Sequence, residues 1–230
     1  MNKAAFTLAE VLITLGIIGV VAAMTLPSLV NKINMHHYIA QLKSDYSVLS
    51  QAQSAIIAEY GSFQAGIQDC DNVTGSGAKH KCFRDTFAKH LKSIRICEQP
   101  YTIGDSKNSC FTEFSKIKLL NGAVATSSYL NGDAATMILA NGSVILFYLD
   151  SASCSYNLEG YFNYKRCGWV TIDVNGLQKP NTFGKDIYVL YVMDKSVKPL
   201  MYEYLYETNK NGDCTSDSTG YSCSGHYLID

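Results

Sequence analysis

The chain has 230 residues with a formal net charge of -1, and 17% of its residues are charged. This length suffices for one medium domain, or for a membrane anchor followed by one domain. The near-neutral net charge excludes a general electrostatic attraction to nucleic acid or to anionic lipid.

The first predicted element is a long apolar helix. Residues 11–30 contain no charged side chain, and a helix of that length spans about 30 Å, the thickness of the hydrocarbon core of a bilayer. Backbone groups in lipid must be satisfied within the segment, so an α-helix is expected. Glu10 lies near the start of this apolar run, where an unpaired charge is costly. Lys3, which precedes the run, favours a cytoplasmic N-terminus.

The run AFTLAEVLITLGIIGVVAAMTLP resembles the class III signal of type IV pilins and of the pseudopilins of type II secretion systems. The resemblance implies that a prepilin peptidase cuts between Ala5 and Phe6 and methylates the new N-terminal Phe6. Ala5 stands where that family usually has glycine. The resemblance also implies that Glu10, at the fifth mature position, is an assembly determinant, and that Pro27 lies where pilin helices bend or melt on assembly.

The chemistry of Glu10 agrees with that resemblance. A cut before Phe6 creates an ammonium group at the end of an apolar helix. Pairing the Phe6 amine of one subunit with Glu10 of its neighbour replaces two unpaired charges by one ion pair. Such a pair sets the axial register between subunits, as a polar residue fixes the register of a coiled coil. Pro27 removes a backbone donor, so a kink or local melting is expected there.

The helix is predicted to continue beyond the membrane. Apolar residues recur at steps of three, four and seven, which marks one face of a helix ending near Gly61: Tyr38, Leu42, Tyr46, Leu49, Ile56 and Tyr60. Four segments follow from these observations. They are a leader peptide (1–5), a transmembrane and filament-core helix (6–30), an amphipathic continuation (31–60) and a globular head (61–230).

Eight cysteines lie beyond the apolar segment, and their even number suggests oxidation outside the cytoplasm. Their spacing favours local pairs, although many other connectivities and buried free thiols stay open: Cys70 with Cys82, Cys97 with Cys110, Cys154 with Cys167, and Cys214 with Cys223.

Residues 79–95 predict a helix in the head. Four apolar residues would share one face and four basic residues the other: Phe83, Phe87, Leu91 and Ile94 opposite Lys81, Arg84, Lys92 and Arg95. A basic face can contact DNA phosphates, but it is more often a solvated surface. No aromatic residues interleave with these charges for base stacking, so DNA is not expected as a partner.

Strand signals follow. Asn141-Gly142 between two apolar runs predicts a β-hairpin, and GWVTIDV, DIYVLYVM and KPLMYEYLYE predict further strands. A row formed by Tyr202, Tyr204 and Tyr206 would suit a glycan, but cross-strand aromatic packing is the commoner cause. Short links between strands predict an antiparallel meander. The expected fold is therefore α+β and pilin-like, with the long helix packed on an antiparallel sheet and disulfides stapling the head.

One loop, IDVNGLQKPNTFGKD at residues 172–186, carries oxygen-bearing side chains that suit Ca²⁺: Asp173, Asn175, Asn181 and Asp186. The loop resembles a stretch in the heads of many pilin-like proteins, and major pseudopilins bind calcium in a head loop. Asx side chains also form such turns unaided, so both explanations stay open. No other cofactor is expected.

The sequence contains no HExxH, no GxSxG and no phosphate-binding glycine loop, so no enzyme is expected. The function that these observations favour is that of a prepilin-like structural subunit in the bacterial inner membrane, single-pass with its head in the periplasm, which then joins a type IV pilus or a type II secretion pseudopilus. Its expected partners are itself or other pilins and pseudopilins, the prepilin peptidase, the inner-membrane assembly platform, and membrane lipid before assembly.

The alternative is a secreted, disulfide-rich binding protein whose conventional signal peptide is cut after Ala23. The first residue of the mature chain separates the two, because it is N-methylated Phe6 in one case and Met24 in the other.

Overall fold

The computed structural model describes residues 7–75, 77–97, 110–126, 130, 132–157, 165–200 and 214–229. Ala5, Phe6 and the tyrosine row at 202–206 therefore lie outside the described residues. The chain divides into two compact units, Met1–His37 and Tyr38–Asp230.

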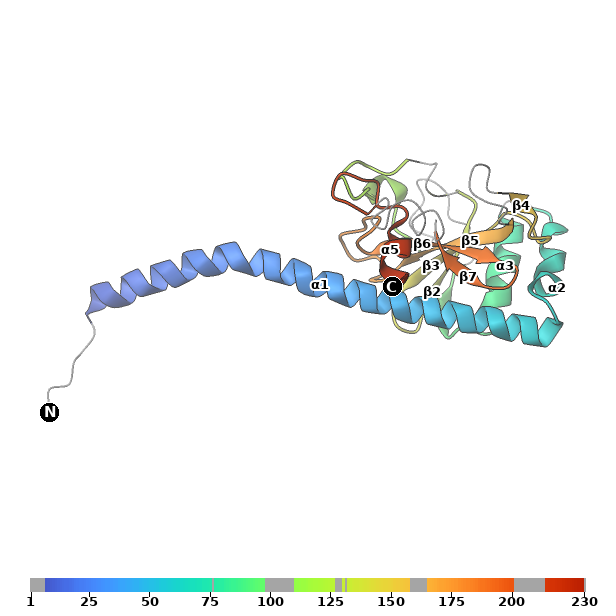
Figure 1. Ribbon diagram of the computed structural model, residues 1–230, viewed down its shortest axis with the longest axis horizontal. Helices are drawn as coiled ribbons and strands as arrows, with labels where there is room; N and C mark the ends of the chain where they lie inside the picture. Colours follow the sequence, from blue (N-terminus) through green and yellow to red (C-terminus); the bar gives the residue numbers. More distant parts are fainter. Residues whose placement is uncertain are drawn as a thin grey trace. The chain divides into compact units, whose positions relative to one another are not determined.

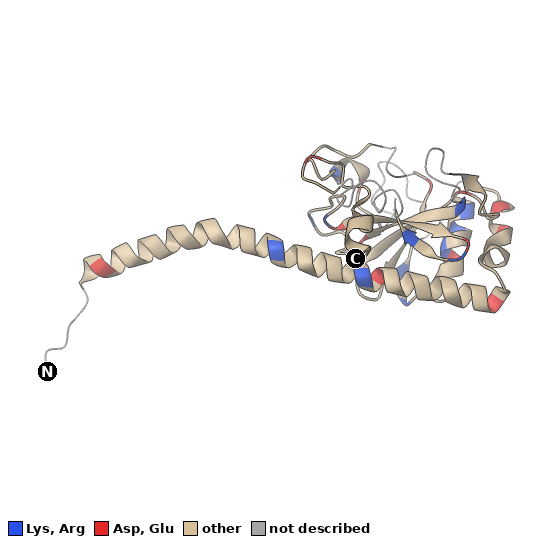
Figure 2. Cartoon of the chain, viewed as in Figure 1, with Lys and Arg blue, Asp and Glu red and all other residues tan. Residues whose placement is uncertain are grey.

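The first unit consists of the beginning of helix α1, which runs from Leu8 to Tyr60. The helix is long and apolar enough to cross a membrane. Between Thr7 and His37 the charged residues are Glu10 and Lys32, and Figure 2 shows this part of the chain almost entirely in the colour of uncharged residues. The expected long apolar helix is thus present.

The second unit is built on an antiparallel sheet. Its strands in the described residues are β1 (Ser93–Ile96), β2 (Ala135–Leu139), β3 (Val144–Leu149), β4 (Tyr156–Asn157), β5 (Lys165–Asp173), β6 (Ile187–Met193) and β7 (Val197–Pro199). The strand order is β1-β2-β3-β5-β6-β7, and β4 pairs with β5. Every pairing is antiparallel and neighbours in the path follow each other in the chain apart from β4, so the predicted meander is confirmed.

Short helices complete the second unit: α2 (Phe63–Ile67), η1 (Gln68–Asp71), α3 (Ala78–Ala88), η2 (Phe114–Lys116) and α5 (Cys223–Leu228). Helix α1 ends at Tyr60, and Gly61 follows it with a φ of 82°. Glycine adopts this left-handed conformation without steric cost, which explains why the helix stops where the sequence predicts.

The predicted hairpin joins β2 to β3. Leu139 donates its backbone N–H to Ser143 O at 2.9 Å, and Gly142 has a φ of 92°. Asn141-Gly142 therefore forms the turn for which its residue types are suited. The register that follows pairs Ile138 with Val144 and Ala135 with Phe147.

The part of α1 that belongs to the second unit, Tyr38–Tyr60, is called the head part of α1, and it covers one face of the sheet, as Figure 1 shows. Leu42, Leu49 and Ile56 are fully buried, in agreement with the predicted stripe, whereas Tyr60 is exposed. Alternate strand residues such as Phe147 and Ile172 face this layer. The intervening residues pack on the other face in a second core that includes Phe111, Phe114, Leu146, Val189 and Phe183.

Four disulfides staple the head, in the local pairing that the cysteine spacing favours. They join Cys70 to Cys82, Cys97 to Cys110, Cys154 to Cys167, and Cys214 to Cys223. Each bridge closes a short segment of chain, so the bridges hold loops and element ends rather than distant parts of the fold.

The prediction of one helix over residues 79–95 is wrong in its second half. Helix α3 ends at Ala88, and Ser93–Ile96 form the edge strand β1, which pairs with β2. The β-branched isoleucines of this segment favour a strand once β2 offers hydrogen-bond partners. The opposed apolar and basic faces therefore do not exist: Ile94 is 68% exposed, whereas Arg84 is 3% exposed.

Candidate functional site

The start of α1 is the first candidate site, because the predicted assembly residue Glu10 lies in it. Thr7 donates its backbone N–H to Glu10 Oε2 at 2.8 Å, and its hydroxyl donates to the same oxygen at 2.8 Å. In return, the backbone N–H of Glu10 donates to Thr7 Oγ1 at 3.2 Å. Thr7 and Glu10 are therefore joined by three hydrogen bonds.

This arrangement is a capping box, in which the N-cap side chain and the side chain three residues later satisfy each other's backbone N–H groups. In a membrane such a cap would replace water, which the free N–H groups of a helix start do not find in lipid. Sequence reasoning missed the role of Thr7. The pattern Thr-x-x-Glu directly before an apolar run indicates the capping role of Thr7.

The two oxygens of the Glu10 carboxylate differ in their contacts. Oε2 accepts both bonds from Thr7, whereas Oε1 accepts none from the described residues. Glu10 is exposed. The carboxylate is thus half occupied by its own helix and keeps one oxygen available for a cation.

The other residues predicted for processing and assembly are placed only in part. Ala5 and Phe6 precede the described residues, and Phe6 is the direct chain neighbour of Thr7. Pro27 lies inside α1, which continues through it without a break. The helix is therefore not melted at Pro27 in the single chain, and its behaviour on assembly stays a prediction.

The loop between β5 and β6 brings Asn181 and Asp186 together. Asp186 accepts the backbone N–H groups of Asn181 at 2.7 Å and of Thr182 at 2.6 Å. The side-chain oxygen of Asn181 accepts the hydroxyl of Thr112 at 2.8 Å. Burial raises the pKa of Asp186 to about 6, and these N–H groups oppose the rise. These two residues hold the turn closed through their own hydrogen bonds.

Asp173 and Asn175 are different, because they leave oxygens without partners. Asp173 Oδ1, Asp173 Oδ2 and Asn175 Oδ1 are buried and lack hydrogen-bond partners in the described part of the chain. Burial raises the pKa of Asp173 well above its usual range, the Asp186 carboxylate raises that pKa further, and the nearby backbone N–H groups of Asn175 and Gly176 oppose the rise. Among the described residues no group of three or more His, Cys, Asp or Glu side chains is placed to hold a metal. Any cation in this loop would therefore need the Asn175 amide oxygen besides the two carboxylates.

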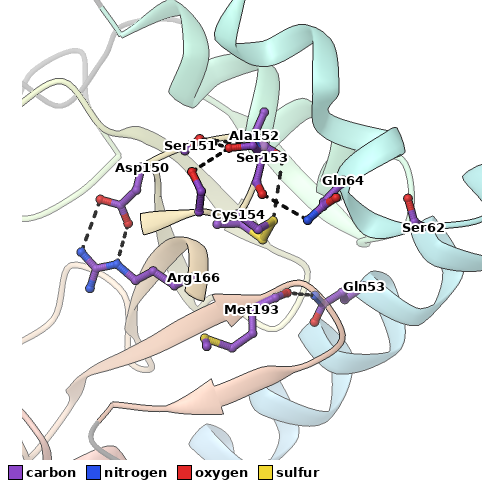
Figure 3. The surroundings of a disulfide bond; sticks show 12 residues. Gln53, Ser62, Gln64, Asp150, Ser151, Ala152, Ser153, Cys154, Arg166 and Met193 are labelled. Atoms are coloured by element: carbon purple, nitrogen blue, oxygen red, sulfur yellow. Dashed lines mark hydrogen bonds and ion pairs between the residues drawn. A yellow bond between two sulfur atoms is a disulfide. The ribbon is translucent and has the colours of Figure 1, made fainter. Parts of the chain in front are cut away.

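A half-buried ion pair of the head, between Arg166 and Asp150, serves the fold. Figure 3 shows Arg166 directed at Asp150 beside Cys154, with the Arg166 Nε to Asp150 Oδ2 distance at 2.6 Å. The Arg166 guanidinium also lies against the rings of Tyr156 and Tyr191. This ion pair fixes the stapled loop between β3 and β5, and its groups are engaged with each other.

The comparisons with known proteins concern the first part of the chain. Residues 1–26 match the model of the prokaryotic N-terminal methylation motif. No curated protein and no solved structure matches the chain. A methylation motif followed by a long apolar helix is consistent with an inner-membrane prepilin, and families of this kind are typically structural rather than enzymatic. The chain therefore carries the N-terminal methylation motif that is typical of type IV pilins and pseudopilins, on a pilin-like α+β fold.

Proposed function

We propose that the protein is a prepilin-like structural subunit of a type IV pilus or of a type II secretion pseudopilus. A prepilin peptidase cuts between Ala5 and Phe6 and methylates Phe6. The processed subunit then leaves the inner membrane and joins a helical filament of identical or related subunits through α1. Before assembly, residues 6–30 span the membrane and the head lies in the periplasm.

The observation that carries this proposal is the carboxylate of Glu10, which lies within the matched motif directly before an apolar run, residues 11–30, that has no charged side chain. In lipid, both that carboxylate and the new Phe6 ammonium are expensive. Pairing them between subunits removes both costs at once and fixes the register of one subunit on the next. The four disulfides support a head outside the cytoplasm, because such bonds persist in oxidising compartments.

The test is incorporation of tagged subunits into filaments sheared from the native host. Wild-type protein is expected in the sheared fraction. Glu10→Leu is expected to remain processed and membrane-bound but to be missing from that fraction. A matched control is Lys32→Gln, which removes the other charged side chain between Thr7 and His37 and should still assemble. Normal incorporation of Glu10→Leu would refute the proposed role of the ion pair.

We further propose that the loop between β5 and β6 takes a calcium ion. The supporting observation is the set of three buried oxygens without partners on Asp173 and Asn175, beside the carboxylate of Asp186. Oxygen atoms of carboxylates and amides are the ligands that Ca²⁺ prefers. A bound cation would supply the partner that these oxygens lack.

Thermal unfolding of the full-length protein in detergent tests the calcium proposal. Calcium at 100 times its Kd is expected to stabilise the wild-type head by about 3 kcal/mol relative to excess chelator. Asp173→Asn should abolish this difference, whereas Asp217→Asn, at an exposed position, should keep it. Equal melting of the wild type with calcium and with chelator would remove the proposal.

A further inference from the structure

The side-chain amide of Asn175 is held by two contacts, and both are made by its nitrogen. Nδ2 donates to the hydroxyl of Tyr38 at 3.2 Å and to the backbone oxygen of Lys179 at 3.1 Å. Because the nitrogen and the oxygen of an amide diverge from one carbon, these contacts also fix the direction of Oδ1. Oδ1 is buried and has no hydrogen-bond partner in the described part of the chain. The amide oxygen is therefore oriented, yet it serves no contact within the fold.

The direction of this oxygen matters because the loop offers few carboxylates. Asp173 contributes two buried oxygens without partners. The Asn175 amide also lies close enough to Asp186 to oppose the rise in the pKa of that carboxyl group. Over the described ranges, no cluster of three or more His, Cys, Asp or Glu side chains could hold a metal. Because Ca²⁺ takes about six to eight oxygen ligands, an amide oxygen fixed beside two carboxylates is a ligand that the loop cannot spare.

The two contacts of Asn175 Nδ2 come from different parts of the fold. Lys179 lies in the same loop, whereas Tyr38 lies on α1 and is the first residue of the second unit. The Tyr38 side chain also packs, partly buried, against the core that α1 shares with the sheet. The hydrogen bond between Tyr38 and Asn175 therefore joins the head part of α1 to the loop between β5 and β6.

We propose that Tyr38 is a positioning residue for the calcium ion: its hydroxyl holds the Asn175 amide so that Oδ1 faces the metal, and the bound ion in turn fastens α1 to the loop. This inference rests on the calcium site proposed above and deepens it. The two effects are reciprocal, because a contact that tightens calcium binding by a given factor is itself strengthened by calcium by the same factor. Calcium thereby regulates how firmly the beginning of the head part of α1 is held.

The first measurement is the Kd for calcium of the full-length protein in detergent, by isothermal titration calorimetry. Tyr38→Phe keeps the ring in the core and removes only the hydroxyl. It is expected to raise the Kd about threefold to tenfold, as the loss of one hydrogen bond implies. The site itself should remain, because Asp173, Asp186 and the Lys179 contact are unchanged.

Tyr46→Phe is the matched control, because it removes another tyrosine hydroxyl from the head part of α1. The Tyr46 hydroxyl donates to Val197 O at 3.2 Å, in β7 rather than in the loop between β5 and β6. This variant also loses a hydrogen bond between the helix and the sheet, but it should keep the Kd of the wild type to within about twofold. Equal Kd values for Tyr38→Phe and Tyr46→Phe would overturn the inference.

The second measurement tests the reciprocal effect by amide hydrogen exchange in residues 38–45. Saturating calcium, compared with excess chelator, is expected to slow exchange there about threefold to tenfold in the wild type. The same comparison should show almost no slowing in Tyr38→Phe. Equal slowing in the two proteins would show that calcium does not act on α1 through Tyr38.

Asp173→Asn distinguishes failure of the inference from failure of the calcium proposal. This variant removes a carboxylate ligand and leaves Tyr38 in place, so calcium binding should be lost. If the wild type binds no calcium, or if Asp173→Asn binds it equally well, the calcium site falls and the inference falls with it. If only Asp173→Asn loses binding and Tyr38→Phe binds as tightly as the wild type, the calcium site stands and its coupling to α1 falls.

Discussion

The carboxylate of Asp45, on the head part of α1, accepts a hydrogen bond of 2.6 Å from the hydroxyl of Ser143 in the turn between β2 and β3. The Asn141 amide donates to the same carboxylate at 2.6 Å. Asp45 is fully buried. The helix and the hairpin are therefore joined by a polar contact on the buried side of α1.

Asp45→Ala is predicted to destabilise the head by about 2–3 kcal/mol, because it removes the buried carboxylate that accepts hydrogen bonds from the buried Ser143 hydroxyl and from the Asn141 amide. Urea unfolding of the full-length protein in detergent measures this change. Lys43→Ala, on the exposed side of the same helix, is the control and should change the unfolding free energy by about 0.5 kcal/mol at most. Equal stabilities for the two variants would contradict the proposed contact.

Arg84 should be essential for the fold rather than for binding. Its Nη1 donates to Cys97 O at 2.5 Å and also to Thr136 O, and its side chain pairs with Asp85. Arg84→Met keeps the apolar stem and removes the donors, so a loss of about 2–3 kcal/mol in unfolding free energy is expected. Arg95→Ala, which changes an exposed residue, should have almost no effect. If Arg84→Met were as neutral as Arg95→Ala, Arg84 would be a surface charge after all.

His80 gives the head a defined sensitivity to acid. It is buried, and its Nδ1 accepts the backbone N–H of Leu149 at 2.9 Å, so it is neutral in the fold. Burial lowers the pKa of His80 to about 4, and the charge of Lys79 lowers it further. The folded pKa lies below the unfolded one, so the stabilising effect is complete above the unfolded pKa and is lost as the pH falls towards 4.

As the pH falls from 7 to 5, protonation of His80 in the unfolded chain is predicted to lower the free energy of unfolding of the wild type by about 2 kcal/mol. His80→Gln keeps an acceptor for Leu149 and does not titrate, so its stability should fall by correspondingly less. Buried carboxyl groups such as Asp186, whose pKa is raised, act in the opposite direction. The readout is therefore the difference between the two proteins in urea unfolding at both pH values. Parallel pH profiles would show that His80 does not titrate as described.

The four disulfides join consecutive cysteines, and this pairing can be tested by peptide mapping. Proteolysis without reduction should give four linked products, each joining cysteines that are neighbours in the sequence. Removing Cys214 and Cys223 together, each as alanine, should destabilise the head by about 2–3 kcal/mol, because a short loop is no longer closed in the unfolded chain. A linked product that joins distant cysteines would contradict the fold described here.

Much of the architecture can be predicted from local patterns in the sequence. The turn at Asn141-Gly142 follows from residues that favour a left-handed backbone, and the buried stripe of α1 follows from helical periodicity. The strands β5 and β6 follow from β-branched and aromatic runs. These features depend on near neighbours in the chain, which is why a single sequence contains them.

The remaining features depend on partners from elsewhere in the chain. Asp45 lies on the buried side of α1 because its acceptor atoms meet donors almost a hundred residues away. The segment Ser93–Ile96 is a strand because β2 pairs with it. The capping box of Thr7 and Glu10 is the exception, because its pattern, Thr-x-x-Glu before an apolar run, is local to the sequence.

The most direct measurement is mass spectrometry of the N-terminus of the protein purified from its native host, with the prepilin peptidase gene intact and deleted. N-methylated Phe6 is expected as the first residue in the intact host, and an uncut chain is expected in the deletion strain. A chain that begins at Met1 in both strains, or one that begins at Met24, would contradict this expectation.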